Sequence, residues 1–224
     1  YGNDAAIASG RRGSSALGTA KPAFSTIMST CSLAAQPRVT RKDSTMSAPA
    51  LPHAVLFDAY GTLFRLETIE RACAAMLALT KSPVPPADFA LLWRTKQLEY
   101  SVHRSLMGEA HYRNFREISA EALDYAIARF AVDMAPSGRD TLLRAWLTPA
   151  ADPAARTALS ALSAVPRAIL SNGEPLMLEE ATRAAGLWEL LDAILSADSV
   201  RTYKPDPRVY ALGTSRFGIP AHEI

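Results

Sequence analysis

Three short, unbroken apolar runs constrain this chain more than any other feature of its sequence. They occupy residues 54–57, 167–170 and 193–195, and the first lies between Pro52 and Gly61. Apolar runs of this length without alternation are typical of strands that are covered on both faces of a parallel sheet. The sequence therefore predicts a parallel sheet at the centre of the fold.

Helical periodicity fills the chain between these runs. No convincing strand occurs from about 65 to 150, so this stretch is expected to be a helical insert. The predicted domains are a core, formed by residues 46–65 and 150–224, and an insert of residues 66–149. The helices are predicted over 66–79, 87–107, 115–132 and 138–147 in the insert, and then from Asp152-Pro153 to about 164, over 175–185 and over 206–217.

The charge of the chain is divided unevenly. The chain has 24 Lys and Arg and 22 Asp and Glu, for a formal net charge of +2. Residues 1–45 hold six basic and two acidic residues, so the rest of the chain is slightly negative. A body without a basic stripe argues against a nucleic-acid partner. No apolar run reaches 18 residues, so no membrane span is expected. We expect a cytoplasmic protein.

Residues 1–45 are rich in Ala, Ser, Thr and Gly and lack sustained periodicity. Such a segment buries little apolar surface, so it is predicted to be disordered. Three origins are open: a non-native leader, translated upstream sequence, or a transit peptide, whose richness in Arg and Ser fits. We favour the first two and exclude the segment from the enzyme.

Polar residues follow the apolar runs at the points where the strands should end. Asp58 follows the first run, Ser171-Asn172-Gly173 follows the second, and Lys204-Pro205-Asp206 lies beyond the third. In open parallel sheets the chemistry sits beyond the carboxyl ends of the strands. Lys204 could pair with Asp58 and keep it ionised. One carboxylate, hydroxyl and amide donors, and one cation suit nucleophilic catalysis through a covalent ester.

The order of these motifs, with Thr62 four residues after Asp58, resembles the haloacid dehalogenase superfamily over residues 53–224. Residues 92–100 and 104–107 are similar to the cap of its (S)-2-haloacid dehalogenases, also called L-2-haloacid dehalogenases, and so is the run 204–210. The resemblance implies an α/β fold with a Rossmann-like parallel sheet core and a helical cap inserted after the first strand. It also implies conversion of a 2-haloalkanoic acid of (S) configuration to an (R)-2-hydroxyacid and halide, without metal or cofactor. Family members are commonly homodimers.

The resemblance assigns roles to individual residues. Phosphatases of this superfamily place a general acid two residues after the nucleophile, and this chain has Tyr60 there, which we count among the substrate-binding residues. A superfamily phosphatase and a non-catalytic interaction protein are the alternative functions. The assigned roles are Asp58 as nucleophile, Thr62 and Lys204 as its support, Ser171 and Asn172 as ligands of the substrate, Arg94 as the group that assists halide departure, Tyr210 as support for the Ser and Lys network, and Leu98 and Phe115 as apolar lining.

The chain departs from the family pattern at its end. After the position of Ile224 that pattern continues into a fourth strand, a Ser-Ser-Asn motif and a further Asp, which align the attacking water. We therefore expect the C-terminal strands of the fold to be missing from this chain. Because the first strand lies between the second and fourth in that pattern, the strand at 54–57 should have an unpaired edge. We expect residues 1–224 alone to be poorly soluble and to lack turnover.

Overall fold

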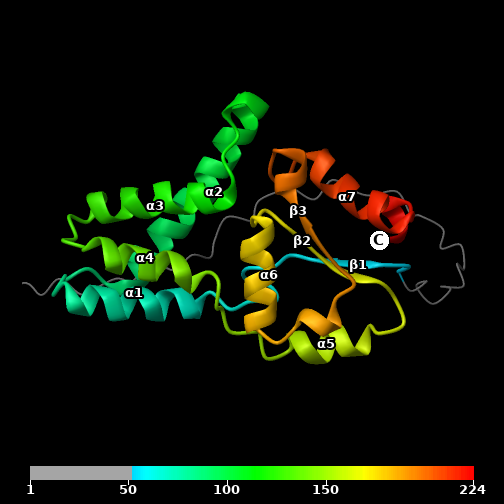
Figure 1. Cartoon of the computed structure of the whole chain (residues 1–224), viewed down its shortest axis with the longest axis horizontal. Coiled ribbons are helices and arrows are strands. Elements are labelled where there is room, and N and C mark those ends of the chain that lie inside the picture. Colours follow the sequence, from blue (N-terminus) through cyan, green and yellow to red (C-terminus); the bar gives the residue numbers. More distant parts are fainter. Residues whose placement is uncertain (1–51) are drawn as a thin grey trace, which may run out of the picture. The chain divides into compact units, whose positions relative to one another are not determined.

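The computed structural model describes residues 52–224, so the disorder predicted for residues 1–45 lies outside the described part. Three parallel strands form one sheet in the order β1-β2-β3 (Figure 1). They are β1 (Val55–Phe57), β2 (Arg167–Ser171) and β3 (Ala193–Ser196). All three strands were predicted from the apolar runs, and the parallel sheet is confirmed. Within the described sheet, β1 is an edge strand, as expected.

In the described chain five α-helices lie between β1 and β2, the first four of which form the insert, one lies between β2 and β3, and one follows β3. This is the α/β fold with a helical insert that the sequence predicted. No helix in residues 52–224 is long and apolar enough to cross a membrane. The helices are α1 (Glu67–Leu79), α2 (Pro86–Met107), α3 (Phe115–Arg129), α4 (Pro136–Ala145), α5 (Ala155–Ala161), α6 (Pro175–Ala184) and α7 (Pro207–Phe217).

Local sequence signals explain most of the helix ends. The Asp206 side chain accepts a hydrogen bond from the backbone N–H of Arg208 and begins α7, which ends at Gly218 in the left-handed region with φ +67°. The predicted start of α5 was wrong. Asp152 accepts a hydrogen bond from the N–H of Ala154 at 2.9 Å and closes a turn, and the helix begins at Ala155.

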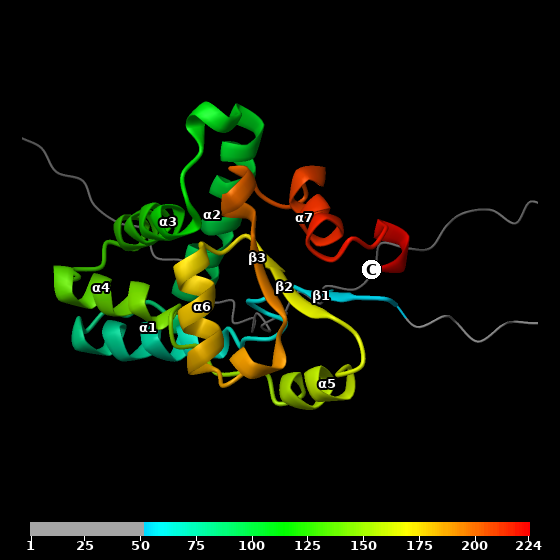
Figure 2. The same cartoon turned by 45° about the vertical axis from the view of Figure 1, so that its right-hand side comes forward.

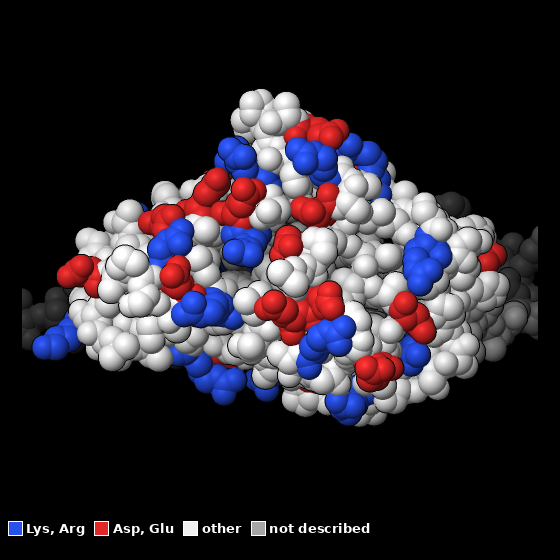
Figure 3. All heavy atoms as spheres, in the orientation of Figure 1, with Lys and Arg blue, Asp and Glu red and all other residues white. Residues whose placement is uncertain are grey.

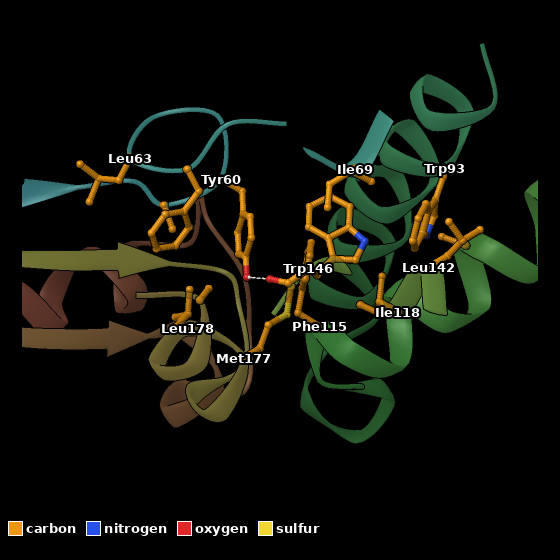
Figure 4. Packing of buried hydrophobic residues seen from close by; sticks show 14 of the residues in the cluster. Tyr60, Leu63, Ile69, Trp93, Phe115, Ile118, Leu142, Trp146, Met177 and Leu178 are labelled. Atoms are coloured by element: carbon orange, nitrogen blue, oxygen red, sulfur yellow. Dashed lines mark hydrogen bonds between the residues drawn. The ribbon is translucent and has the colours of Figure 1, made fainter. Parts of the chain in front are cut away.

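The helical block, residues 67–145, has its own apolar centre. The buried side of α2 consists of Phe89, Trp93, Gln97 and Ser101, one residue per turn, and it packs against α3. The two rings are fully buried, and burial of each large apolar side chain contributes about 2 kcal/mol. Figure 4 shows how Trp146, just after α4, lies between this centre and the residues that follow β1.

The carboxyl ends of the strands point toward the helical block (Figures 1 and 2). Hydrogen bonds join the two parts here. The Tyr112 hydroxyl donates to Asp198 at 2.6 Å, and the Ser105 hydroxyl oxygen accepts from the N–H of Tyr203 at 3.1 Å. Tyr203 precedes Lys204, so the helical block contacts the loop that carries this lysine.

Basic and acidic side chains are interspersed on the face that Figure 3 shows, without a field of one sign. Ion pairs such as Arg139 with Asp124 at 2.5 Å and Arg104 with Glu121 at 3.1 Å join neighbouring helices. Exposed pairs of this kind contribute about 0–1 kcal/mol each. An anionic ligand would therefore depend on charges close to its binding site.

Candidate active site

Asp58 directly follows β1 and sits at the start of a tight turn. The carbonyl oxygen of Ala59 accepts hydrogen bonds from the N–H groups of Thr62, Leu63 and Phe64 at 3.2, 2.9 and 2.9 Å. Gly61 makes this turn possible, because its φ of +94° is a conformation that a residue with a Cβ rarely adopts. The turn leaves the Asp58 side chain 44% exposed at the carboxyl edge of the sheet.

Lys204 fills the space between Asp58 and β2. Its Nζ lies 2.6 Å from Asp58 Oδ1 and also donates to the carbonyl oxygen of Leu170 at 2.8 Å. Its backbone N–H donates to Asn172 Oδ1 at 2.7 Å. The lysine is thus fixed at both ends by groups at the end of β2. Its positive charge lies against the carboxylate of Asp58.

Ser171 and Asn172 form the turn after β2. The buried Ser171 Oγ accepts a hydrogen bond from the N–H of Gly173 at 3.2 Å. Gly173 is required because a Cβ there would lie 2.7 Å from the Leu178 side chain. The side-chain oxygen of Asn172 accepts from the Lys204 backbone, and the role of Asn172 as a substrate ligand stays a prediction. In the described chain only its NH₂ group is free for a ligand.

Arg94 approaches the site from α2 and is partly buried. Its guanidinium lies 5.9 Å from the centre of the Phe115 ring and 5.6 Å from that of Trp146, and its Nη1 donates to Gln97 Oε1 at 3.3 Å. Burial lowers the pKa of Arg94, while the negative charge of Asp58 opposes that shift. The site therefore has one cation bonded to Asp58 and a second that acts on it through space.

Tyr60 connects the two sides of the site. It is 6% exposed, and its hydroxyl donates to the backbone carbonyl of Trp146 at 2.7 Å (Figure 4). The rings of Tyr60 and Trp146 meet edge to face at 5.2 Å. Burial raises the pKa of the Tyr60 hydroxyl well above its usual value. Tyr60 therefore anchors the turn after β1 to the chain just after α4, and its role in binding substrate stays a prediction.

The roles predicted for Thr62, Leu98 and Tyr210 stay predictions, and the structure places these residues as follows. The exposed Thr62 lies at the tip of the turn after Ala59, and its hydroxyl makes no hydrogen bond to Asp58. Leu98 is 44% exposed, because the buried side of α2 is the Trp93, Gln97 and Ser101 side. The Tyr210 ring lines a cavity beside Asp58, but in residues 52–224 its hydroxyl bonds neither Ser171 nor Lys204.

Phe115 lies near the site as expected. It begins α3, is 2% exposed, and packs beneath the Arg94 guanidinium. Two residues that contact Arg94 were missed from the sequence, Gln97 and Trp146. Gln97 has a signal, because a Gln on the apolar side of an amphipathic helix needs polar partners inside the protein. Trp146 has none, since a Trp at the end of a helix is most simply a packing residue.

A cavity of about 680 Å³ opens beside Asp58 and Lys204 along the free edge of β1. Its walls are mainly apolar and include Leu56, Leu170 and Tyr210. Asp58 and Lys204 line it, whereas Arg94, Phe115, Ser171 and Asn172 do not, so the cavity lies beside the candidate site and does not enclose it. Within residues 52–224, no group of three His, Cys, Asp or Glu side chains could hold a metal ion.

Comparison with known proteins identifies the family. The model of the haloacid dehalogenase-like hydrolases matches residues 52–224. (S)-2-haloacid dehalogenase 1 of Pseudomonas sp. (strain CBS-3) is 39% identical over 173 residues, which are 76% of this chain and 73% of that protein.

Solved structures agree with this family. L-2-haloacid dehalogenase RSc1362 has a TM-score of 0.73 at 37% identity, and the match covers 78% of this chain and 77% of that one. The L-2-haloacid dehalogenase of Xanthobacter autotrophicus with chloropropionic acid covalently bound has a TM-score of 0.68 at 35% identity, covering 76% of this chain and 66% of its own. The present chain thus spans about two thirds of the Xanthobacter enzyme. The chain belongs to the haloacid dehalogenase-like hydrolase family, in which it groups with the (S)-2-haloacid dehalogenases.

Proposed function

We propose that this protein hydrolyses (S)-2-haloacids to (R)-2-hydroxyacids and halide through a covalent ester on Asp58. The 2.6 Å ion pair between Asp58 and Lys204 at the carboxyl edge of the sheet carries this proposal. It supplies a partly exposed carboxylate beside a fixed cation at that edge. The relatives support the substrate class by name, and the Xanthobacter structure holds chloropropionic acid covalently.

The first step is a displacement at carbon. An oxygen of the Asp58 carboxylate attacks C2 of the haloacid from the side opposite the halogen. The new C–O bond forms as the carbon–halogen bond breaks, and the halide leaves with the bonding electron pair. This step inverts C2 and needs no proton donor, because halide is a weak base. It agrees with Tyr60, whose proton is held by the Trp146 carbonyl and whose raised pKa makes it a poor acid.

The second step is hydrolysis of the ester. Water attacks the carbonyl carbon of the Asp58 side chain, the bond between that carbon and the ester oxygen breaks, and the hydroxyacid leaves. One oxygen from water stays in the Asp58 carboxylate, and a water proton goes to bulk base. The C2–O bond is not broken, so the inverted configuration remains. The balance is one haloacid and one water in, and one hydroxyacid, one halide and one proton out.

The surrounding groups have separate tasks in this proposal. Lys204 fixes and charge-balances the nucleophile, and the free NH₂ of Asn172 with the Ser171 hydroxyl binds the substrate carboxylate. Arg94 lies partly buried on the helical side of the site, where low polarity strengthens its attraction for a departing anion. It therefore assists the halide as negative charge develops on it.

Single turnover of (S)-2-chloropropionate in ¹⁸O-labelled water tests the mechanism. The peptide that contains Asp58 is then analysed by mass spectrometry, and the label is expected in the Asp58 carboxylate. Asp58→Asn serves as the control and should release no halide. Label that goes directly into the lactate product, with an unlabelled Asp58, would exclude the ester. Mg²⁺-dependent release of phosphate from p-nitrophenyl phosphate would favour the phosphatase alternative.

A further inference from the structure

Gln97 is a fully buried amide that the proposed mechanism does not use. It lies one turn after Arg94 in α2, among Trp93, Phe89 and other apolar residues. Burying an amide without hydrogen bonds costs about 1–3 kcal/mol. Gln97 avoids this cost with two bonds, one to α3 and one to Arg94.

The bond to α3 fixes which way the amide points. The Ser119 hydroxyl donates its single proton to the carbonyl oxygen of Phe115 at 2.7 Å. Its oxygen can then only accept from Gln97, and Gln97 Nε2 lies 2.9 Å away. Trp93 Nε1 also holds the backbone carbonyl of Ser119 at 2.8 Å, so the position of Ser119 is itself fixed.

With its NH₂ committed to Ser119, Gln97 must present its carbonyl oxygen to Arg94. This oxygen accepts from Arg94 Nη1 at 3.3 Å. If the amide were reversed, its NH₂ group would face the N–H groups of Arg94, and no hydrogen bond could form between them. The rings of Phe115 and Trp146 bound the guanidinium elsewhere but accept no conventional hydrogen bond from it. The Gln97 oxygen is thus the one hydrogen-bond acceptor that holds the Arg94 guanidinium in the described chain.

We propose that Gln97 is a positioning residue that fixes the orientation of Arg94 toward the leaving halide. This proposal rests on the proposed function, because it acts through the step assigned to Arg94. It predicts that loss of the Gln97 oxygen leaves the fold intact and frees the guanidinium to rotate. Its tests must therefore separate the motion of Arg94 from turnover.

The first test needs no turnover. In ¹⁵N spectra of the arginine side chains, assigned with Arg94→Lys, the rotation of the Arg94 guanidinium should be about tenfold faster in Gln97→Met than in the wild type. Ser101→Ala is the matched control. Ser101 is equally buried on α2 but donates only to the carbonyl of Leu98, so Arg94 should be unchanged. Unchanged Arg94 rotation in Gln97→Met would overturn the proposal.

The second test uses two leaving groups. Chloride leaves less readily than bromide and needs more help from Arg94. We expect kcat to fall about tenfold for 2-chloropropionate and about threefold for 2-bromopropionate in Gln97→Met, with KM little changed. Equal losses for both substrates would indicate a merely structural role and overturn the proposal.

Two outcomes distinguish a failure of the proposed function from a failure of the proposal for Gln97. If the full-length wild-type protein releases no halide, the proposed function fails, and the spectra alone decide whether Gln97 orients Arg94. If Gln97→Met does not fold, Ser119→Ala replaces it, because it retains Gln97 and removes the acceptor that orients the amide. Faster Arg94 rotation in Ser119→Ala, with Ser101→Ala unchanged, supports the proposal, and no change in either overturns it.

Discussion

The two sides of the active site are held in different ways. On the sheet side, Asp58 bonds to Lys204, and Lys204 also bonds to the Leu170 carbonyl and to Asn172 Oδ1, all at the carboxyl ends of β1 and β2. On the helical side, Arg94 is held by side chains from α2, α3 and the end of α4. The position of Asp58 therefore depends on the topology of the sheet, whereas the position of Arg94 depends on the packing of side chains. Mutations should therefore act differently on the two sides.

The largest effect is expected from Lys204→Met on the sheet side. The variant removes the charge 2.6 Å from Asp58 while it keeps much of the side-chain volume. We expect kcat for 2-chloropropionate to fall about a thousandfold, because the variant loses the cation that is fixed beside the reacting carboxylate. Halide release under saturating substrate measures it. Lys81→Met, at an exposed lysine after α1, is the control. A fall in kcat of less than tenfold in Lys204→Met would refute the role of Lys204 as support for the nucleophile.

Arg94→Lys should have the next largest effect. Lysine keeps the charge but loses the planar group that lies near Phe115 and Trp146 and reaches Gln97. We expect kcat to fall about a hundredfold for 2-chloropropionate. The far-ultraviolet circular dichroism spectrum should not change. A loss as large as that of Lys204→Met would mean that the two sides contribute equally.

Tyr60→Phe tests the anchor between the sides. The substitution leaves the Trp146 carbonyl without its donor at a buried position, so the free energy of unfolding should fall by about 1–2 kcal/mol. Urea denaturation measures this change. Tyr125→Phe is the matched control, since Tyr125 is 39% exposed and its hydroxyl makes no hydrogen bond in the described chain. Equal stability of both variants would show that the Tyr60 bond contributes nothing.

The smallest effect on stability is expected from the thiol of Cys73, which is packed inside the helical block. This thiol on α1 is fully buried, and burial raises its pKa to about 12. An unfolded thiol titrates near about 8.5, so the native state keeps a proton that the unfolded state loses. Stability should therefore fall by about 0.8 kcal/mol as pH rises from 7 to 9, and Cys73→Ala should remove this part of the pH dependence. Rapid alkylation of native Cys73 at pH 8, followed by mass spectrometry, would contradict its burial.

The sequence predicted the sheet side well. The apolar runs located all three strands, and parallel strands must end at one edge of a sheet. Asp58 and the Asn172 turn were therefore expected together, and Lys204 was expected to join them from the loop beyond the third strand. The detailed bonds were less predictable. Thr62 and Tyr210 lie near Asp58 without bonding it, because one turn of backbone or one helix rotation decides where a hydroxyl points.

The sequence by itself determined the α/β fold, the helical insert and the meeting of Asp58 with Lys204. These follow from hydrophobic periodicity and strand topology, which are properties of the local chain. Only the tertiary structure decided how Arg94 is held, with Gln97, Phe115 and Trp146 around it. The contacts with Phe115 and Trp146 join residues far apart in sequence, and the Gln97 contact is oriented by Ser119 on α3. Packing of this kind depends on side-chain volumes in three dimensions, and no local pattern records it.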